Sequence, residues 1–396
     1  MGLLSGRNSW PLWDIKVETE YINVLGIKHF NSSKTSTNTC WSEIHDKINC
    51  ITKSMTCRKL TLLQKSAIIN SMLTSQIWYR AQTYPLSLVW SKHINKLLLI
   101  YLWGGKSNPI KHDTLTLDKK EGGLSLIDIY IKAKCIFACR LMKQFLIDEK
   151  QTSLLSYYIA VCLNPVFNIR SLPQNICAVN TPYFREGIEV IRKYLHLKGF
   201  PNISSKMAYG NLLEKYPPTI QQKYQFNNWK NIWNNVSFRY IPIQTRDILF
   251  KFLHGILPNK VRLKQIRIAV SDNCDHCKVP ETNKHMVYQC LEIVEVKNFF
   301  LRLLEYCGFS NINMNHLIIL DIPKMGKHCK NTTILLTSLY ISSIWYGRSN
   351  KTGILRSLKY NIIREKTILE EILRNKFTDV FTEPFHLLNR EIMERI

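Results

Sequence analysis

Acidic residues are scarce in this sequence, and the common catalytic motifs are missing. The 396 residues include 29 Asp and Glu against 54 Lys and Arg, and no two aspartates are adjacent. Two-metal nucleotidyl transfer requires closely placed carboxylates that bridge the ions, whereas the adjacent pair Glu370-Glu371 would diverge by ~100° on a helix. No Walker-type loop, His-Glu-x-x-His or Gly-x-Ser-x-Gly motif occurs either. We therefore expect no enzymatic activity from this chain on its own.

The sequence also lacks segments that would direct it into or across a membrane. No basic region precedes the first apolar residues, and Arg7 and Asp14 interrupt them, so no secretory signal is expected. The longest uncharged run, 151–169, is too rich in polar residues for a membrane span and predicts a buried helix that ends before Pro165. The 12 cysteines show no secreted-type spacing. This favours an intracellular location, either a cytoplasmic ribonucleoprotein or the nucleus.

Positive charge is what the sequence has in excess. The formal net charge is +25, which exceeds what solubility requires and predicts a polyanionic partner, RNA and/or DNA. The excess is spread along the chain, with +10 over residues 1–150, +7 over 151–250 and +8 over 251–396. Such a distribution is typical of folded surfaces that follow a phosphate backbone, although an anionic membrane surface would also attract it.

Four residues have the spacing of a metal site. Cys274, Cys277, His285 and Cys290 stand in the order C-x2-C-x7-H-x4-C, which supplies the four soft or borderline ligands that zinc prefers in a tetrahedron. Four protein ligands leave no open position, so the predicted Zn²⁺ is structural. The alternative is that these cysteines are ordinary buried apolar residues. His276 is a rival ligand, but its place between the paired cysteines predicts an exposed ring.

The spacing of the last two ligands constrains the local fold. Pro280 and Thr282 are placed to begin a helix that carries His285. Residues 285 and 290 would lie ~140° apart on an ideal helix. The helix must therefore end or loosen before Cys290.

A basic stripe precedes the metal site. If 259–268 is a helix, Lys260, Lys264 and Arg267 fall within ~40° of one another on its surface. We interpret these residues as a candidate nucleic-acid-binding surface. The alternative is an ordinary solvated helix face.

Hydrophobic periodicity predicts a mainly α-helical protein. Residues 15–30 alternate apolar and polar side chains, which is typical of one or two short strands. Helices are expected over 58–80, 91–103, 126–147, 245–254, 259–268 and 355–377. In the first of these, Leu62, Ile69, Met72, Leu73 and Ile77 have the spacing of a packed face. The paired glycines Gly122-Gly123 predict a tight turn.

This pattern divides the chain into five predicted parts. They are a short β element at 1–30, a helical domain at 31–150, an irregular helical linker at 151–228, a small zinc-binding helical module at 229–330 and a C-terminal helical segment at 331–396.

Several short sequence segments resemble segments of one family, the reverse transcriptases of non-LTR (LINE-type) retrotransposons. They occur here in the same order as in that family. Five of them resemble the part of the family's polymerase that follows the palm domain. They are Asn23-Val24-Leu25-Gly26-Ile27, Trp41 with Ile48, Leu60-Thr61-Leu62-Leu63-Gln64-Lys65, Tyr101-Leu102-Trp103-Gly104-Gly105-Lys106 and Gly122-Gly123-Leu124-Ser125-Leu126. The run from Arg246 to Pro258, and the cluster with Glu281, resemble the family's C-terminal zinc-binding region. The match covers roughly 20–150 and 230–350.

The resemblance implies a function for each part. Residues 1–30 would end a palm-like β element, 31–150 would be a thumb-like helical bundle that grips a template-primer duplex, and 230–290 would help to hold RNA or target DNA. The family's Asp-Asp box would lie before residue 20, so we expect a truncated, C-terminal, nucleic-acid-binding fragment of this transposable-element polyprotein, with a full-length reverse transcriptase as a further partner. Two alternatives stay open: the non-catalytic part of a polymerase completed in trans, and a membrane-surface or protein-interaction module.

Overall fold

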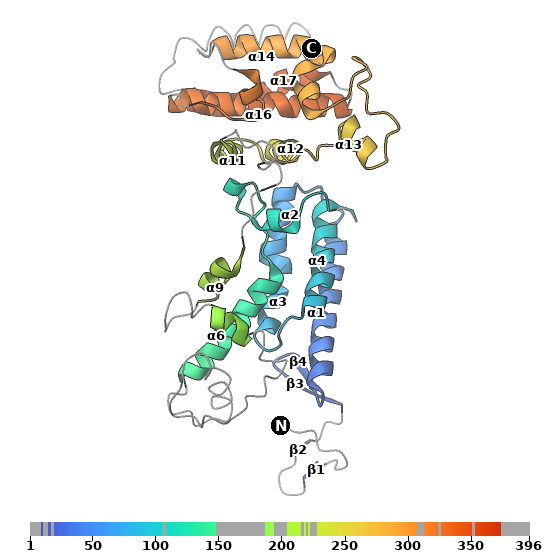
Figure 1. Ribbon diagram of the computed structural model, residues 1–396, viewed down its shortest axis with the longest axis vertical. Coiled ribbons are helices and arrows are strands. Elements are labelled where there is room, and N and C mark those ends of the chain that lie inside the picture. The colour runs from blue at the N-terminus through green and yellow to red at the C-terminus, as the bar shows by residue number, and fades with distance from the viewer. Residues whose placement is uncertain are drawn as a thin grey trace. The chain divides into compact units, whose positions relative to one another are not determined.

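The computed structural model describes residues 9–10, 15–16, 20–105, 108–147, 187–193, 204–214, 218, 221, 228–306, 313–323, 326–350 and 353–373. These residues are mainly helical, with short antiparallel strands near the N-terminus, as the sequence predicted (Figure 1). The chain divides into two compact units. Unit 1 comprises residues 1–108 and 126–215, and unit 2 comprises 109–125 and 216–396.

The N-terminal strands form two antiparallel pairs. β1 (Ser9–Trp10) pairs with β2 (Ile15–Lys16), and β3 (Tyr21–Val24) pairs with β4 (Ile27–Phe30). In the second pair Tyr21 lies opposite Phe30 and Val24 opposite Ile27. Leu25 and Gly26 connect these strands with φ angles of 50° and 75°, the left-handed pair that a two-residue type I′ turn requires.

The remaining described elements of unit 1 are helical. They include α1 (Ser33–Met55), α2 (Leu62–Ile68), η1 (Ile69–Leu73), α3 (Ser75–Ala81), α4 (Leu88–Trp103), α6 (Ile129–Ile147) and α9 (Ser205–Leu212). Polar side chains begin several of them, because Ser32, Thr61, Ser87 and Ser204 each accept a hydrogen bond from the first turn. α4 ends at Gly104, whose φ of 70° stops the helix where the sequence predicted.

Apolar packing holds α1 to α4 together. Trp41 and Ile48 of α1, Ile77 of α3 and Ile94 of α4 are fully buried. The indole N–H of Trp41 donates to the carbonyl of Pro85 at 3.1 Å, which ties the loop before α4 to α1. A second apolar group joins α6 to α9 and includes Phe137, Leu141, Ile191 and Ala208.

The helix predicted over 58–80 is three helical segments. Thr61 and Gln64 form a capping box that starts α2 at Leu62. The π turn η1 follows and shifts the helical phase before α3. Met72, which the sequence placed on the packed face, is consequently 37% exposed.

Unit 2 contains the metal-site residues. Its described helical elements are α5 (His112–Thr116), η2 (Lys119–Glu121), α11 (Trp229–Val236), α12 (Ile243–Leu253), α13 (Lys260–Gln265), η3 (His285–Gln289), η4 (Leu291–Ile293), α14 (Val294–Tyr306), α15 (Met314–Leu317), α16 (Lys327–Asn350), α17 (Ile354–Arg364) and α18 (Lys366–Leu373). One hydrophobic core runs from Trp229 to Ile372 and includes Cys274 and Cys290. The long helix α16 packs against α12, α17, α18 and η3 within this core.

Two predicted boundaries differ from the structure. Residues 109–125 belong to unit 2 rather than to the helical domain at 31–150, because the ring Nε2–H of His254 donates to the carbonyl of Gly122 at 2.9 Å. The predicted boundary between 330 and 331 does not separate two cores, since α14, α16 and α17 bury side chains in the core that contains Cys274. Both differences arise from contacts between residues distant in sequence, which local periodicity does not encode.

Some predictions lie wholly or partly outside the described residues. The helix expected at 151–169 is outside them, as is most of the linker expected at 151–228. The helix expected over 355–377 forms α17 and α18, which separate at Glu365, as far as residue 373. Within the described part of the chain, no helix has the length and apolar character needed to span a membrane.

Candidate metal centre

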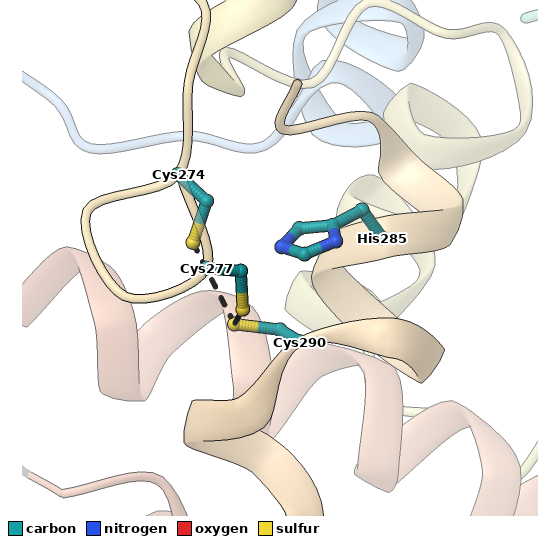
Figure 2. A group of neighbouring side chains, drawn as sticks. All are labelled: Cys274, Cys277, His285 and Cys290. Atoms are coloured by element: carbon teal, nitrogen blue, oxygen red, sulfur yellow. Dashed lines mark hydrogen bonds between the residues drawn. The ribbon is translucent and has the colours of Figure 1, made fainter. Parts of the chain in front are cut away.

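The first cysteine pair lies on a tight turn after α13. The backbone N–H of Cys274 donates to the carbonyl of Val279 at 2.8 Å, and that of Lys278 donates to the carbonyl of Cys274 at 3.0 Å. Lys278 closes the turn with a left-handed φ of 59°. Figure 2 shows the side chains of Cys274 and Cys277 pointing from this turn toward His285 and Cys290.

His285 and Cys290 mark the start and the exit of η3. Thr282 begins this segment, because its hydroxyl accepts from the N–H of His285 at 3.1 Å. η3 is a π turn in which the N–H of Cys290 donates to the carbonyl of His285 at 2.9 Å. Cys290 itself is extended, with φ −68° and ψ 137°. The helix therefore loosens and ends before Cys290, as the five-residue spacing predicted.

The four predicted ligands converge. The sulfur atoms of Cys274 and Cys277 each lie 3.7 Å from that of Cys290, and the four ligand atoms all lie within 4.8 Å of one another. Two sulfurs bound at ~2.3 Å to a tetrahedral zinc would be about 3.8 Å apart, whereas a disulfide requires about 2.05 Å. The separation therefore fits thiols arranged around a cation.

The histidine completes the donor set. His285 is only 4% exposed, and its Nε2 is buried without a hydrogen-bond partner. The ring turns toward the three sulfur atoms (Figure 2). An unsatisfied buried polar atom costs about 1–3 kcal/mol, which coordination to a metal would offset. The residues present thus form a Cys3His cluster that can hold a metal ion.

Burial and hydrogen bonding act in opposite directions on two of the thiols. Burial raises the pKa of Cys290 to about 12. Burial also raises the pKa of Cys274, but the backbone N–H groups of Cys277 and His276 and the ring of His285 outweigh it and lower that pKa to about 6. Because the thiolate is the metal ligand, binding of a cation must release protons, most of all from Cys290.

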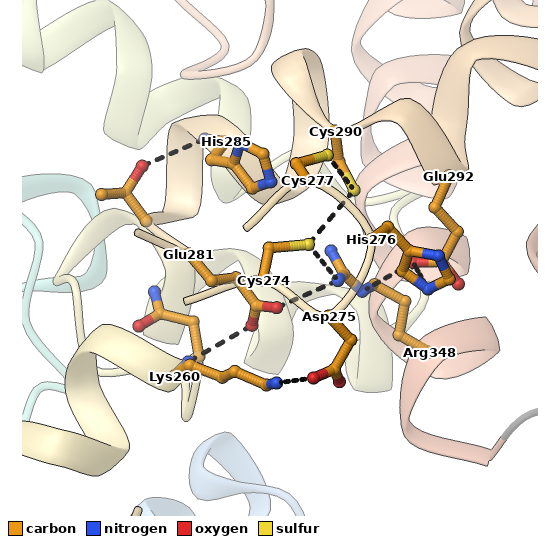
Figure 3. Close-up of polar contacts among 12 residues, drawn as sticks. Lys260, Cys274, Asp275, His276, Cys277, Glu281, His285, Cys290, Glu292 and Arg348 are labelled. Atoms are coloured by element: carbon orange, nitrogen blue, oxygen red, sulfur yellow. Dashed lines mark hydrogen bonds and ion pairs between the residues drawn. The ribbon is translucent and has the colours of Figure 1, made fainter. Parts of the chain in front are cut away.

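The rival ligand lies outside the cluster. The ring of His276 is 52% exposed, and its Nε2 lies 3.4 Å from the carboxylate of Glu292. Figure 3 shows it beside Glu292 rather than among the sulfur atoms. His276 is therefore exposed, as its position between the paired cysteines predicted.

The predicted basic stripe is interrupted. α13 ends at Gln265, and Arg267 follows with a left-handed φ of 60°, so the helix predicted over 259–268 is wrong at its C-terminal end. The N–H of Ile268 donates to the carbonyl of Leu263 at 2.8 Å, a helix-ending bond that usually needs glycine before it. Arg267 therefore does not share the helical face of Lys260 and Lys264.

The two lysines that remain on α13 are paired with acids. The Nζ of Lys264 lies 2.8 Å from the carboxylate of Asp272, and Lys260 pairs with Asp275. These aspartates flank Cys274 in the sequence. The metal-site turn thus offsets the charge of the helix that precedes it.

A larger basic surface is encoded by a lack of acids rather than by a motif. Residues 47–112 contain no Asp or Glu, and their ten basic residues are Lys47, Lys53, Arg58, Lys59, Lys65, Arg80, Lys92, Lys96, Lys106 and Lys111. Up to residue 108 this stretch lies in unit 1, where it forms the second half of α1 and all of α2, η1, α3 and α4. Counting charge over residues 1–150 as a whole conceals it, because the acids before residue 47 and after residue 112 lower the net charge of that range.

Within unit 1, six of these basic side chains are exposed. They are Lys47 and Lys53 on α1, Arg58 and Lys59 after it, and Lys92 and Lys96 on α4. Two others have internal partners: Arg80 lies 3.5 Å from Glu43, and the Nζ of Lys65 donates to the carbonyl of Leu102 at 3.3 Å. α1 and α4 pack against each other (Figure 1). Unit 1 thus presents six exposed cations on and beside two adjacent helices, and the two acids of α1, Glu43 and Asp46, precede all six in the sequence.

No protein-family model matches the chain, and a search of curated proteins found no match.

Proposed function

We propose that this chain binds nucleic acid through the exposed basic side chains of the acid-free stretch in unit 1, that a zinc ion stabilises unit 2, and that the chain is a non-catalytic part of a non-LTR reverse transcriptase polyprotein. The observation that carries the proposal is the stretch 47–112, which has ten basic residues and no acidic ones, and whose described part within unit 1 is mainly helical. A solvated helix normally mixes both signs of charge. A surface of one sign attracts a polyanion.

Zinc is the metal that the donor set supports best. Three thiolates and one imidazole are typical of structural zinc sites, and hard cations such as Mg²⁺ and Ca²⁺ prefer oxygen. Four protein ligands leave no position for water or substrate, so the ion would order the chain rather than react. Metal analysis of purified protein should give about one zinc per chain. Replacing Cys290 with serine should abolish that stoichiometry, whereas replacing the exposed Cys50 with serine should leave it unchanged.

Phosphate contacts should dominate the affinity for nucleic acid. Each phosphate neutralised by Lys or Arg contributes about −0.9 to the slope of log affinity against log salt on duplex DNA, and about −0.7 on a single strand. Fluorescence anisotropy with labelled RNA, DNA and RNA–DNA hybrid, repeated across salt concentrations, measures this slope. A slope near zero on every substrate would overturn the proposal. Displacement by anionic vesicles but by no nucleic acid would favour a membrane-surface function instead.

The absence of catalysis rests on the sequence and on the described residues. Among these residues, the Cys3His cluster is the one group of three or more His, Cys, Asp or Glu side chains gathered closely enough to hold a metal. Two-metal phosphoryl transfer needs bridging carboxylates. Primer-extension and nuclease assays with Mg²⁺ or Mn²⁺ should therefore show no product. Synthesis that is lost on mutating an acid of this chain would contradict the proposal.

The resemblance to reverse transcriptases supports the same assignment. It equates 31–150 with the thumb, the part that grips a template-primer duplex, and the acid-free stretch falls within this range. Preference for a primed template over a single strand of equal length, in the anisotropy assay, tests this part of the proposal.

A further inference from the structure

Arg348 is buried beside the metal centre although it comes from a distant helix. It lies in the last turn of α16, and its side chain is only 15% exposed. Its Nη2 lies 3.8 Å from the sulfur of Cys274 and 3.0 Å from the carboxylate of Glu281. Its Nε lies 3.3 Å from the carboxylate of Glu292. Figure 3 shows the guanidinium between these groups.

These contacts join Arg348 to both halves of the cluster. Cys274 and Glu281 belong to the turn that holds the first ligand pair, and Glu292 follows Cys290 in η4. Glu281 also accepts from the backbone N–H of Lys260 at 3.2 Å, which connects the same network to α13. A single side chain of α16 thus contacts the segments before η3 and after it.

The charge of the occupied metal centre explains why a cationic side chain lies beside it. A divalent ion with three thiolates and a neutral imidazole carries one net negative charge. In a buried site that charge is unfavourable unless it is compensated. Arg348 supplies a permanent positive charge and an N–H directed at a ligand sulfur, and residues of this kind orient metal ligands and tune their donor strength. The Nη1 of Arg348 is buried without a hydrogen-bond partner, a cost that a purely packing role would not justify.

We propose that Arg348 is the counter-cation and positioning residue of the metal centre, so that α16 completes a site whose ligands all come from residues 274–290. This inference rests on the proposed metal binding. It means that the centre is not an autonomous zinc module: its affinity for the ion depends on a side chain that follows the last ligand by 58 residues.

The test replaces Arg348 in the full chain with Gln, which removes the charge, and with Lys, which keeps it. The matched control is Arg356→Gln, an exposed arginine of α17. Competition with a chromophoric chelator gives the zinc affinity. Loss of an outer-shell partner typically weakens metal affinity about 10- to 100-fold. We expect this loss for Arg348→Gln, a smaller loss for Arg348→Lys and no change for Arg356→Gln.

A spectroscopic readout separates positioning from a general loss of stability. With Co²⁺ in place of zinc, removal of the cation beside Cys274 should raise the energy of the sulfur electrons and move the sulfur-to-cobalt charge-transfer band to longer wavelength, with partial return in Arg348→Lys. An unchanged band and affinity in Arg348→Gln would overturn the inference even if the variant melts earlier. Failure of the parent chain to bind zinc or cobalt would instead overturn the metal site itself.

Discussion

Gly123 occupies the tightest backbone contact among the glycines that the structure describes. A Cβ added there would lie 2.0 Å from the carbonyl oxygen of Leu117, which is backbone and cannot swing aside. Backbone hydrogen bonds from the N–H of Leu124 to the carbonyl of Leu115, and from the N–H of Ser125 to the carbonyl of Leu117, hold the two chain segments together beside Gly123. Glycine is therefore required here by space.

Replacing Gly123 with alanine should destabilise unit 2. Overpacking in a well-packed interior costs typically 1–3 kcal/mol, and a backbone obstacle places Gly123→Ala at the upper end, about 3 kcal/mol. Gly210 of α9 is the matched control, because an added Cβ meets nothing within 4 Å. Gly210→Ala should be neutral or stabilising by about 0.5–1 kcal/mol. Chemical denaturation of the two variants checks this, and equal stabilities would refute the role assigned to Gly123.

His254 should make the stability of unit 2 depend on pH. Burial lowers its pKa from 6.5 to about 4, although the hydrogen bond to the carbonyl of Gly122 opposes the shift. Its ring packs on Trp233 and Phe250, with centroids 5.2 and 4.4 Å away. Below about pH 6.5 this histidine is protonated in the unfolded chain but stays neutral in the folded chain. Its contribution to the free energy of unfolding is therefore fully present above that pH and is lost as the pH decreases toward 4.

The contribution of His254 can be isolated by substitution. The free energy of unfolding should fall by about 1.4 kcal/mol per pH unit between roughly pH 6.5 and 4 because of this one group. In His254→Gln the side chain can still donate to Gly122 but does not titrate. The difference between the two proteins, measured by urea denaturation across this range, cancels the contributions of all titratable groups that both contain. A difference that is independent of pH would show that the ring is not held neutral.

At the scale of elements, the sequence predicted structure well wherever local chemistry decides it. The end of α4 at Gly104, and the start after Thr282 of the helical segment that leads into η3, follow from residues whose conformational preference is strong. The end of α13 could not be predicted, because Arg267 adopts a left-handed φ in a position where glycine is the usual signal. The metal centre could likewise be predicted only in part. The spacing of the four ligands identifies the cluster, whereas Arg348 reaches it only because α16 packs against η3 in the folded protein.

Charge on α4 and charge on α13 should have different effects on nucleic-acid binding. The double substitution Lys92→Ala with Lys96→Ala removes two exposed cations of α4, and should flatten the salt slope by about 1.8 on duplex DNA or about 1.4 on a single strand. The double substitution Lys260→Ala with Lys264→Ala is the control. These lysines already pair with Asp275 and Asp272, so the slope should change little.

The comparison discriminates between the two surfaces. Anisotropy titrations at four or more salt concentrations give both slopes, and circular dichroism confirms that each variant keeps its helical content. If only the α13 variant alters the slope, the interface includes the two lysines of α13 rather than the exposed lysines of α4. If neither does, the remaining charge of the chain carries the binding.

At the scale of the molecule, the metal centre is part of a large core rather than a separate domain. Cys274 and Cys290 belong to the apolar core that extends from α11 to α18. Small zinc fingers unfold completely without metal because they have little other core. Unit 2 has a core of its own, so its dependence on the ion should be partial and local.

Removal of the metal should therefore open one region and leave the rest folded. Hydrogen exchange measured by mass spectrometry, with and without a zinc chelator, should show faster exchange over residues 260–293 and over the last turn of α16, where Arg348 anchors the cluster. Peptides from α11, and from α1 and α4 of unit 1, serve as internal controls and should keep their protection. Loss of protection throughout unit 2 would mean that the core depends on the ion as a whole. No change over 260–293 would mean that the cysteine turn and η3 are held by apolar packing alone, and that the cluster contributes nothing to the stability of the fold.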